Sequence, residues 1–533
     1  MHDSLARRLA SRPSHRSGRV GAIRPLEALD PRAMLAANLG IEMATTLPPI
    51  VVPGDKVVLA ATVTNRGDAP MSGPVTVRFL APDASGAPTQ VAVITKSVSL
   101  TPGKSVVLST RWTVNDAAPP GAHDLTARLD ASPFTGSAAD DTATRAGGLS
   151  LRYLFGNFGA RRNIALSTTD DDGTVVTFAL KGAGYGEFRP AEFQDQRAGL
   201  DLIGTDGSTQ LTITAKGGDN VATLENTINV AGSLRRLDAK SVNFSGSLAV
   251  GGTLGEFVAR DLDDLDMTIA GTGAPMRFTA RDASNVRLST ATPVAQLDVA
   301  RWQWLVASAD PSPAATSSIS APWIGKLTVK SDFSAITSIS GAGAPAQSLA
   351  SARIGGIFGG QLAVVGNIGS FAAGTIDSGM LIGSGTVASF AANNATMASV
   401  WARSIVKLDL GAADRIDVAA GCTFDATSLP ALAAGNGGVI SWGAGSIGAI
   451  GVRGSLGCGR FACGVDPVDG SVLNADDTIA GRGTIGKIEI RGSANDLIIA
   501  ATGLPATARI GGAMIRTSLD TRFMWLDDSP LSP

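Results

Sequence analysis

The chain has 533 residues, of which 17% are charged, 44% hydrophobic and only 5% aromatic, and its formal net charge is −2. This length predicts two or three domains, and the near-zero net charge gives no support for nucleic acid as a partner. The sequence contains no run of eighteen apolar residues, so no membrane-spanning helix is expected. His occurs only at positions 2, 15 and 123, which excludes His bases and His metal ligands from most of the chain.

The first 24 residues carry six Arg against one Asp. They lack the apolar segment of a secretory signal peptide and predict a disordered arm. The following stretch, "PLEALDPRAMLAA" at 25–37, resembles the LEPR-XLL motif of planctomycete-type bacterial surface and secreted proteins, although Asp30 stands where Glu is usual and Met34 replaces a Leu. The resemblance implies export of a protein whose residues 1–38 form a basic arm with this motif. The matching residues are Leu26, Glu27, Pro31, Arg32 and Leu35.

From residue 41 to about 131 the apolar pattern has a period of two, which is typical of half-buried strands. Turn signals such as "VPGD", "TPGK" and "APPGA" separate the candidate strands. Several short strands in about ninety residues favour an antiparallel, Ig-like β-sandwich, assigned to 39–155. The expected strands are 55–65, 73–81, 89–100, 104–114 and 123–130.

Two segments of this region, "PGDKVVLAATVTNRGDAP" and "PPGAHDLTARLD", resemble CARDB, a bacterial cell-adhesion-related Ig-like domain. Asn65 and Gly67 match the turn between early strands of that family, and His123 stands where an aromatic residue is common. The resemblance implies a spacer or adhesion module without catalysis.

The rest of the chain repeats an apolar anchor that has apolar partners three residues before and two residues after it. Neighbouring anchors are mostly 18 to 21 residues apart, with weaker anchors at Ala352 and Ala508, and the intervals 408–450 and 450–488 are about twice as long. Self-similarity at such a period indicates a solenoid. The anchors are Leu237, Phe257, Phe278, Leu297, Leu327, Phe371, Phe390, Leu408, Ile450 and Ile488.

Two solenoids have this pattern, the leucine-rich repeat and the parallel β-helix. The position that is Asn in leucine-rich repeats holds residues such as Val242, Leu262 and Ser493, and a second β-like segment follows each anchor, for example at 247–252, 266–271 and 361–366. The sequence therefore favours an all-β fold with a long parallel β-helix at 156–510 and a cap or tail at 511–533. In each coil the anchor and the residue two positions later share a face and enter the core.

Basic residues recur three positions after several anchors, where stacked coils would align them on the outside. One interpretation is a binding surface for an anionic polysaccharide or cell-envelope polymer. The other is a solvated face of mixed charge, because Asp238, Asp261, Asp282 and Glu489 lie beside these residues. The basic positions are Lys240, Arg260, Arg281, Lys330, Arg453 and Arg491.

Other chemistry has weaker signals. Asp261, Asp282 and Arg281 form the one local cluster worth testing for the carboxylate catalysis of polysaccharide lyases and hydrolases. The acidic stretches 261–266 and 168–174 allow Ca²⁺ but lack the ligand spacing of a known loop. Cys458 and Cys463 either pair across a short loop or stay free.

These features predict a non-enzymatic structural or adhesion protein, extracellular or at the cell surface, that presents a β-helical rod to carbohydrate or to other cells. The alternative is a carbohydrate-active β-helix enzyme, and an intracellular scaffold is the third possibility.

Overall fold

The computed structural model describes residues 36–83, 85–115, 119–130, 140–170, 172–190, 199–305, 317–433, 439–467, 472–473 and 477–526. The predicted basic arm and nearly all of the LEPR-XLL-like stretch lie outside these residues. The described chain is almost entirely β, and its helical segments there are α1 (Leu429–Ala433) and the 3-10 turn η1 (Thr517–Leu519). No helix in this part of the chain is long and apolar enough to cross a membrane.

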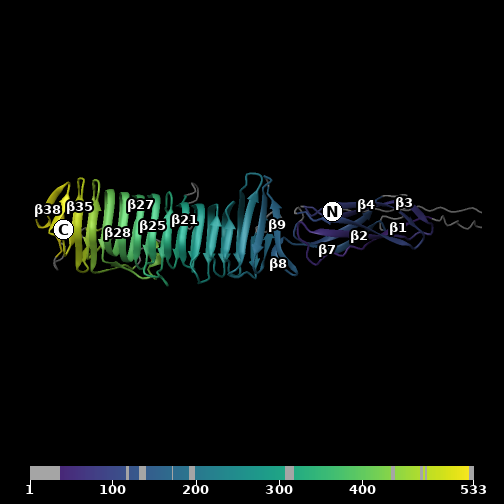
Figure 1. Ribbon diagram of the computed structural model, residues 1–533, viewed down its shortest axis with the longest axis horizontal. Coiled ribbons are helices and arrows are strands. Elements are labelled where there is room, and N and C mark those ends of the chain that lie inside the picture. The colour runs from purple at the N-terminus through teal and green to yellow at the C-terminus, as the bar shows by residue number, and fades with distance from the viewer. Residues whose placement is uncertain are drawn as a thin grey trace, which may run out of the picture.

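The molecule is elongated, with two small sheets at one end and a long stack of strands behind them (Figure 1). The two sheets are antiparallel, with strand orders β1-β2-β5 and β4-β3-β6-β7, and alternate residues of each strand enter a shared core. All five expected strands are present, and β1 and β7 complete the sheets. The strands are β1 (Leu39–Met43), β2 (Lys56–Asn65), β3 (Met71–Pro82), β4 (Pro88–Leu100), β5 (Ser105–Thr113), β6 (Gly121–Leu129) and β7 (Thr142–Leu151).

The expected turn at Asn65 and Gly67 is present. The Asn65 side chain is fully buried, donates to the carbonyl oxygens of Ala69 (2.8 Å) and Leu100 (3.1 Å), and accepts the N–H of Gly67 at 3.0 Å. A Cβ at Gly67 would lie 2.2 Å from the carbonyl oxygen of Ala36. The turn therefore needs the Asn side chain to satisfy buried backbone groups and Gly to allow the chains to approach.

The next strands pair mainly antiparallel, so the expectation of a parallel stack from residue 156 is wrong for the first coils. Parallel pairing begins where β12 meets β14 and β13 meets β15. The sheets and the stack are joined by Arg161, whose two Nη atoms donate to the carboxylate oxygens of Asp55 at 2.8 Å each. These strands are β8 (Leu154–Phe158), β9 (Arg161–Thr169), β10 (Val175–Lys181), β11 (Tyr185–Arg189), β12 (Gly199–Ile203) and β13 (Gln210–Lys216).

Beyond this point each stretch of chain lies on the previous one, and its strands pair in parallel in three series. The third series joins the remaining parts of the longer strands, for example Leu224 with Phe244, Asp261 with Asp282 and Phe358 with Ile376. The anchor series runs β13-β15-β17-β19-β21-β23-β25-β27-β28-β31-β35-β37, and the second series runs β12-β14-β16-β18-β20-β22-β24-β26-β28-β32-β36-β39. The strands are β14 (Ala222–Val230), β15 (Arg236–Ala239), β16 (Val242–Val250), β17 (Glu256–Ala259), β18 (Asp261–Ile269), β19 (Met276–Ser284), β20 (Arg287–Thr290), β21 (Val294–Gln303), β22 (Ser318–Ala321), β23 (Ile324–Val329), β24 (Ile336–Ile339), β25 (Leu349–Phe358), β26 (Gln361–Val364), β27 (Ile368–Asp377), β28 (Met380–Ala420), β31 (Gly445–Val452), β32 (Gly459–Cys463), β35 (Gly483–Ile490), β36 (Leu497–Ala501), β37 (Thr507–Ile510), β38 (Ala513–Arg516) and β39 (Phe523–Trp525).

The pairing register confirms the predicted repeat. Each anchor from Leu237 to Phe390 pairs with the next one, through the weaker anchor Ala352. Leu408 then pairs with Ile450, and Ile450 with Ile488.

The two long intervals are therefore single coils with excursions. The first leaves after Ala420 through the antiparallel pair β29 (Cys422–Thr423) and β30 (Ser441–Trp442), with α1 between them. The second leaves after Cys463 through β33 (Val465–Asp466) and β34 (Thr478–Ile479).

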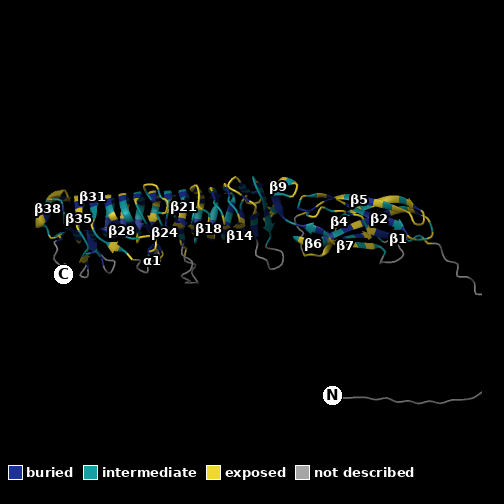
Figure 2. Cartoon of the chain, turned by 90° about the horizontal axis from the view of Figure 1, so that it is seen from below, coloured by how far each residue is buried: buried dark blue, intermediate teal, exposed yellow. Residues whose placement is uncertain are grey.

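Aromatic side chains stack along the inside of the coils. One run joins Phe244, Phe257, Phe278 and Trp302, and a second joins Phe333, Phe358, Phe371 and Phe390, with neighbouring ring centroids 5.0 to 6.1 Å apart. Trp302 is fully buried and satisfies its Nε1–H on Ser317 Oγ at 2.8 Å. Exposed residues concentrate in the turns and on the sandwich (Figure 2).

A second apolar layer covers the outside of the second series in its C-terminal half. Outward residues there are apolar, such as Ile382, Ala419 and Ala462, and Leu432 of α1 packs on them as part of the first excursion. Gln361 Nε2 also donates to the carbonyl oxygen of Leu432 at 2.9 Å. The excursions therefore cover a face that would otherwise expose apolar surface to water.

We expect Phe371→Ala to destabilise the central coils by about 3–5 kcal/mol, because it leaves a cavity in a close-packed stack. Phe371 is 1% exposed, and its ring lies 5.0 Å from that of Phe390 with 10° between the planes. Hydrogen–deuterium exchange measures this loss of stability as weaker protection of the backbone amides in β25 to β28. Ser370→Ala, on the outward side of the same strand, is the control, and equal protection in both variants would contradict the stacked core.

Candidate functional site

The predicted basic positions do not form one continuous row. Arg260 and Arg281 lie on adjacent coils, the Arg281 N–H donating to the Arg260 carbonyl oxygen at 2.6 Å, and Arg453 and Arg491 lie on adjacent coils near the C-terminal end. Between these groups the equivalent position holds residues without charge, so that Lys330 is separated from both. The intervening residues are Ala300, Gly355, Gly374, Asn393 and Gly411.

The first group is a set of ion pairs between coils. Asp261 and Asp282 pair in register, and Arg281 donates through Nε to Asp261 Oδ1 at 2.7 Å and lies 3.5 Å from Asp282 Oδ2. Arg301, which the sequence reasoning missed, lies 3.4 Å from Asp282 Oδ1. The hydrogen bond to Asp261 raises the pKa of Arg281.

This geometry does not favour the catalytic use of Asp261 and Asp282. Catalytic carboxyl groups need oxygen atoms that are free to contact a substrate, whereas those of Asp261 and Asp282 are contacted by Arg281 and Arg301. The same pattern continues along β18, where Arg287 of β20 contacts Asp266 and Asn285 Nδ2 donates to Asp264 Oδ1 at 3.0 Å. These residues therefore stabilise the stacking of coils.

The second group surrounds a hollow of about 260 Å³, here called the Gly451 hollow, on the anchor series of three successive coils. At the centre of the hollow the middle coil presents the small residues Ala449 and Gly451, and its Arg453 follows directly after the strand. The flanking coils present charged residues in register with them, Lys407 and Asp409 on one side and Lys487 and Glu489 on the other. Arg453 and Arg491 complete the lining.

Each carboxylate of the Gly451 hollow contacts two cations. Asp409 lies 3.2 Å from Lys407 Nζ and 3.3 Å from Arg453 Nε. Glu489 lies 2.9 Å from Lys487 Nζ and 3.3 Å from Arg491 Nε, and the Lys487 hydrogen bond is the main cause that lowers the pKa of Glu489. Four cations and two carboxylates leave a formal surplus of two positive charges.

The carboxylates lie deeper than the cations. The Asp409 and Glu489 side chains are 31% and 28% exposed, whereas the cationic side chains are 53% to 71% exposed. An approaching molecule therefore meets the cations first and hydrogen-bond acceptors below them. Of this set, the sequence reasoning named Arg453 and Arg491 as candidate ligand-binding residues. Glu489 was named only as a neutralising neighbour, and Lys407, Asp409 and Lys487 were missed because the doubled spacing hid the fact that these coils are adjacent.

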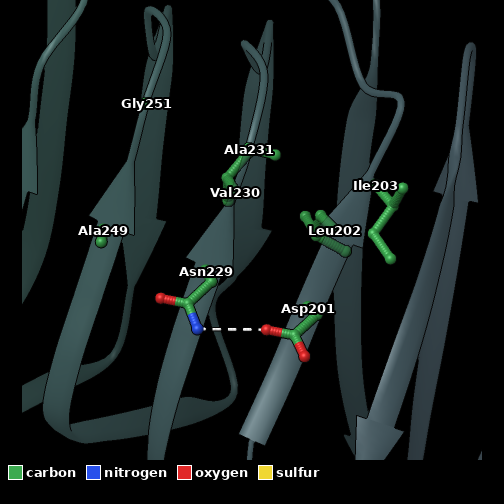
Figure 3. A pocket seen from close by; sticks show the side chains of 8 residues that line it. All are labelled: Asp201, Leu202, Ile203, Asn229, Val230, Ala231, Ala249 and Gly251. Carbon is green, nitrogen blue, oxygen red and sulfur yellow. Dashed lines mark hydrogen bonds between the residues drawn. The ribbon is translucent and has the colours of Figure 1, made fainter.

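Two other hollows offer less. One, of about 290 Å³, lies on the second series, where Asn229 Nδ2 donates to Asp201 Oδ1 at 3.1 Å (Figure 3). Arg189 also contacts Asp201, at 2.6 Å. The other lining side chains of this hollow are aliphatic. A wider one, of about 560 Å³, lies at the junction with the sandwich, but its cations Arg152 and Arg161 already contact Glu187 and Asp55.

All three cysteines are free, so the possible Cys458–Cys463 disulfide is not formed. Cys463 faces the core, whereas Cys458 is half-buried in a turn, and burial raises the pKa of Cys463 to about 12. In the part of the chain that the structure describes, no three His, Cys, Asp or Glu side chains gather as a metal site requires.

Comparison with known proteins gives little. No protein-family model matches the chain, and no curated protein matches it. Among solved structures, the CARDB domain of a Pyrococcus furiosus protein, determined in complex with di-metal ions, is 20% identical and covers 22% of this chain and 89% of its own, with a TM-score of 0.17. A solution structure of the same domain is 21% identical and covers 22% of this chain and 97% of its own, with a TM-score of 0.17. Spo0M, a sporulation control protein from Bacillus subtilis, is 12% identical, covers 29% of this chain and 78% of its own, and has a TM-score of 0.16.

We expect iodoacetamide to modify Cys458 much faster than Cys422 and Cys463 in the native protein. Burial protects the latter two and raises the pKa of each to about 12, so that little thiolate, the reactive species, is present at neutral pH. Mass spectrometry of digested peptides measures the modification, with guanidinium-unfolded protein as the control. Rapid native labelling of Cys463 would contradict its inward position, and protection of Cys458 and Cys463 that only a reductant removes would indicate a disulfide.

Proposed function

We propose that this chain is a non-enzymatic structural and adhesion protein, extracellular or at the bacterial cell surface. In this proposal an Ig-like, CARDB-type sandwich carries a parallel β-helix, which presents an extended surface to carbohydrate or to neighbouring cells.

The observation that carries the proposal is the continuity of the stack. From β12 to β39 successive coils pair in parallel around one hydrophobic core, and the ion pair of Arg161 with Asp55 joins this stack to the sandwich. Such a repeat resists local unfolding through its nearest-neighbour interfaces and holds surface side chains at a fixed spacing. An extended rod that fixes groups of charged side chains on successive coils suits attachment to a polymer better than it suits turnover of a small molecule.

The assignment to the cell surface rests on the resemblance of residues 25–37 to the LEPR-XLL motif and of the sandwich sequence to CARDB. Neither resemblance specifies a ligand. An anionic polysaccharide or envelope polymer is the proposed partner because the hollow at the C-terminal end of the rod has surplus positive charge.

The alternative, a carbohydrate-active enzyme, requires clustered carboxylates or a basic proton acceptor that can reach the substrate. Asp261 and Asp282, the candidates for that role, both contact arginines. The proposal therefore treats these residues as structural.

To test the proposal, the full chain is incubated with a panel of acidic and neutral polysaccharides. We expect retention of an acidic polysaccharide without a fall in its molecular mass, measured by pull-down and size-exclusion chromatography. Depolymerisation that Asp282→Ala abolishes, with Asp298→Ala as the matched control on a neighbouring coil, would favour the enzyme instead. In the native organism we expect the protein in the envelope or medium, and recovery from the cytosol would overturn the localisation.

A further inference from the structure

Position 451 holds glycine although neither the backbone conformation nor the packing there requires it. A Cβ added there would meet only the carbonyl oxygen of Leu408, at an ordinary contact distance of 3.6 Å. Its φ is not in the left-handed region. By contrast, a Cβ at Gly448 or Gly486, on the same and the next coil, would lie 2.5 or 2.4 Å from backbone oxygen of the preceding coil.

The equivalent outward position accepts larger side chains elsewhere in the stack. Successive pairings align Asp238 with Val258 and Val258 with Thr279, and the same row later holds Arg353. Glycine is disfavoured inside a strand because it orders a flexible backbone and contributes no side-chain packing. What Gly451 provides is therefore open space between Asp409 and Glu489.

That space has the dimensions and chemistry of a sugar subsite. The two flanking coils are two strand spacings apart, roughly 9.6 Å, which leaves room for one pyranose ring above Gly451. Carboxylates accept hydrogen bonds from hydroxyl groups, and Lys and Arg bind anionic groups. In the Gly451 hollow the acceptors Asp409 and Glu489 are the less exposed side chains, and the cations Arg453 and Arg491 are more exposed to solvent.

We propose that the Gly451 hollow binds one uronic acid residue of an acidic polysaccharide. The sugar carboxylate contacts Arg453, Arg491 and the two lysines, Lys407 and Lys487, while its ring hydroxyls donate to Asp409 and Glu489. A polyanion without accessible hydroxyl groups, such as duplex DNA, would bring its phosphates close to both carboxylates and bind less well. This inference rests on the proposed contact with carbohydrate and assigns it to one place and one ligand class.

The test measures binding of the full-length protein to polygalacturonate by isothermal titration calorimetry, with methyl-esterified polygalacturonate and duplex DNA as comparison ligands. Wild type is expected to bind polygalacturonate, more weakly at higher salt because part of the attraction is between exposed charges, and to bind both comparison ligands at least roughly tenfold more weakly.

Gly451→Leu is the decisive variant, because it fills the hollow and changes no charge. We expect it to lose at least roughly tenfold in affinity, while its melting temperature stays at or above that of wild type. Ala372→Leu, at the equivalent outward position of a coil outside the hollow, is the matched control and should bind like wild type. The double variant Arg453→Ala/Arg491→Ala should weaken binding by a similar factor, and Arg353→Ala should not.

The possible results separate the two proposals. If Gly451→Leu binds as wild type does, the hollow is not the site, although carbohydrate contact elsewhere on the rod still stands. Equal binding of duplex DNA or of the methyl ester by wild type would overturn the uronate assignment. If wild type binds none of the acidic or neutral polysaccharides of the panel, the proposed carbohydrate contact fails together with this inference.

Discussion

The structure depends on parallel hydrogen bonding between successive coils in a register that puts like residues on top of one another. Because each anchor lies over the next, the interior is a set of columns, and each column must hold side chains of compatible size. Phe371 on Phe390 and Leu408 on Ile450 are two levels of the same column. The same register aligns the outer surface, where it brings Asp261 beside Asp282 and lets Arg281 contact both. Core and surface are thus ordered by one constraint.

This constraint explains which parts of the fold were predictable from sequence. The alternation within strands and the apolar anchors are local signals, so the sandwich strands and the anchor register were found correctly, including the weak anchor Ala352. The first coils were expected to be parallel but are antiparallel, because strand direction is set by turns and partners that residue periodicity does not encode. The excursions after Ala420 and Cys463 were also not identified. Their apolar residues pack on the outside of the stack, whereas the repeat describes only the inside.

The candidate site shows the same limit. Arg453 and Arg491 were named because they occupy a fixed position after their anchors, which is a local property. Their combination with Asp409 and Gly451 depends on Leu408 pairing directly with Ile450 across an interval of doubled length. Sequence spacing alone did not show whether this interval held one coil or two. A charged cluster assembled across an insertion becomes visible only when strand pairing is known.

The direction of the strands differs between the two parts of the molecule. Sandwich strands run along the long axis, whereas stack strands run across it (Figure 1). Hydrogen bonds between strands run across the strands, perpendicular to them in antiparallel pairs and slanted in parallel pairs. Tension between the two ends would therefore load the bonds of the stack mainly along their length and those of the sandwich in shear. Bonds loaded lengthwise break one coil at a time, whereas sheared bonds must break together. Under a steady pull the stack would therefore open coil by coil and lengthen, while the sandwich held its shape.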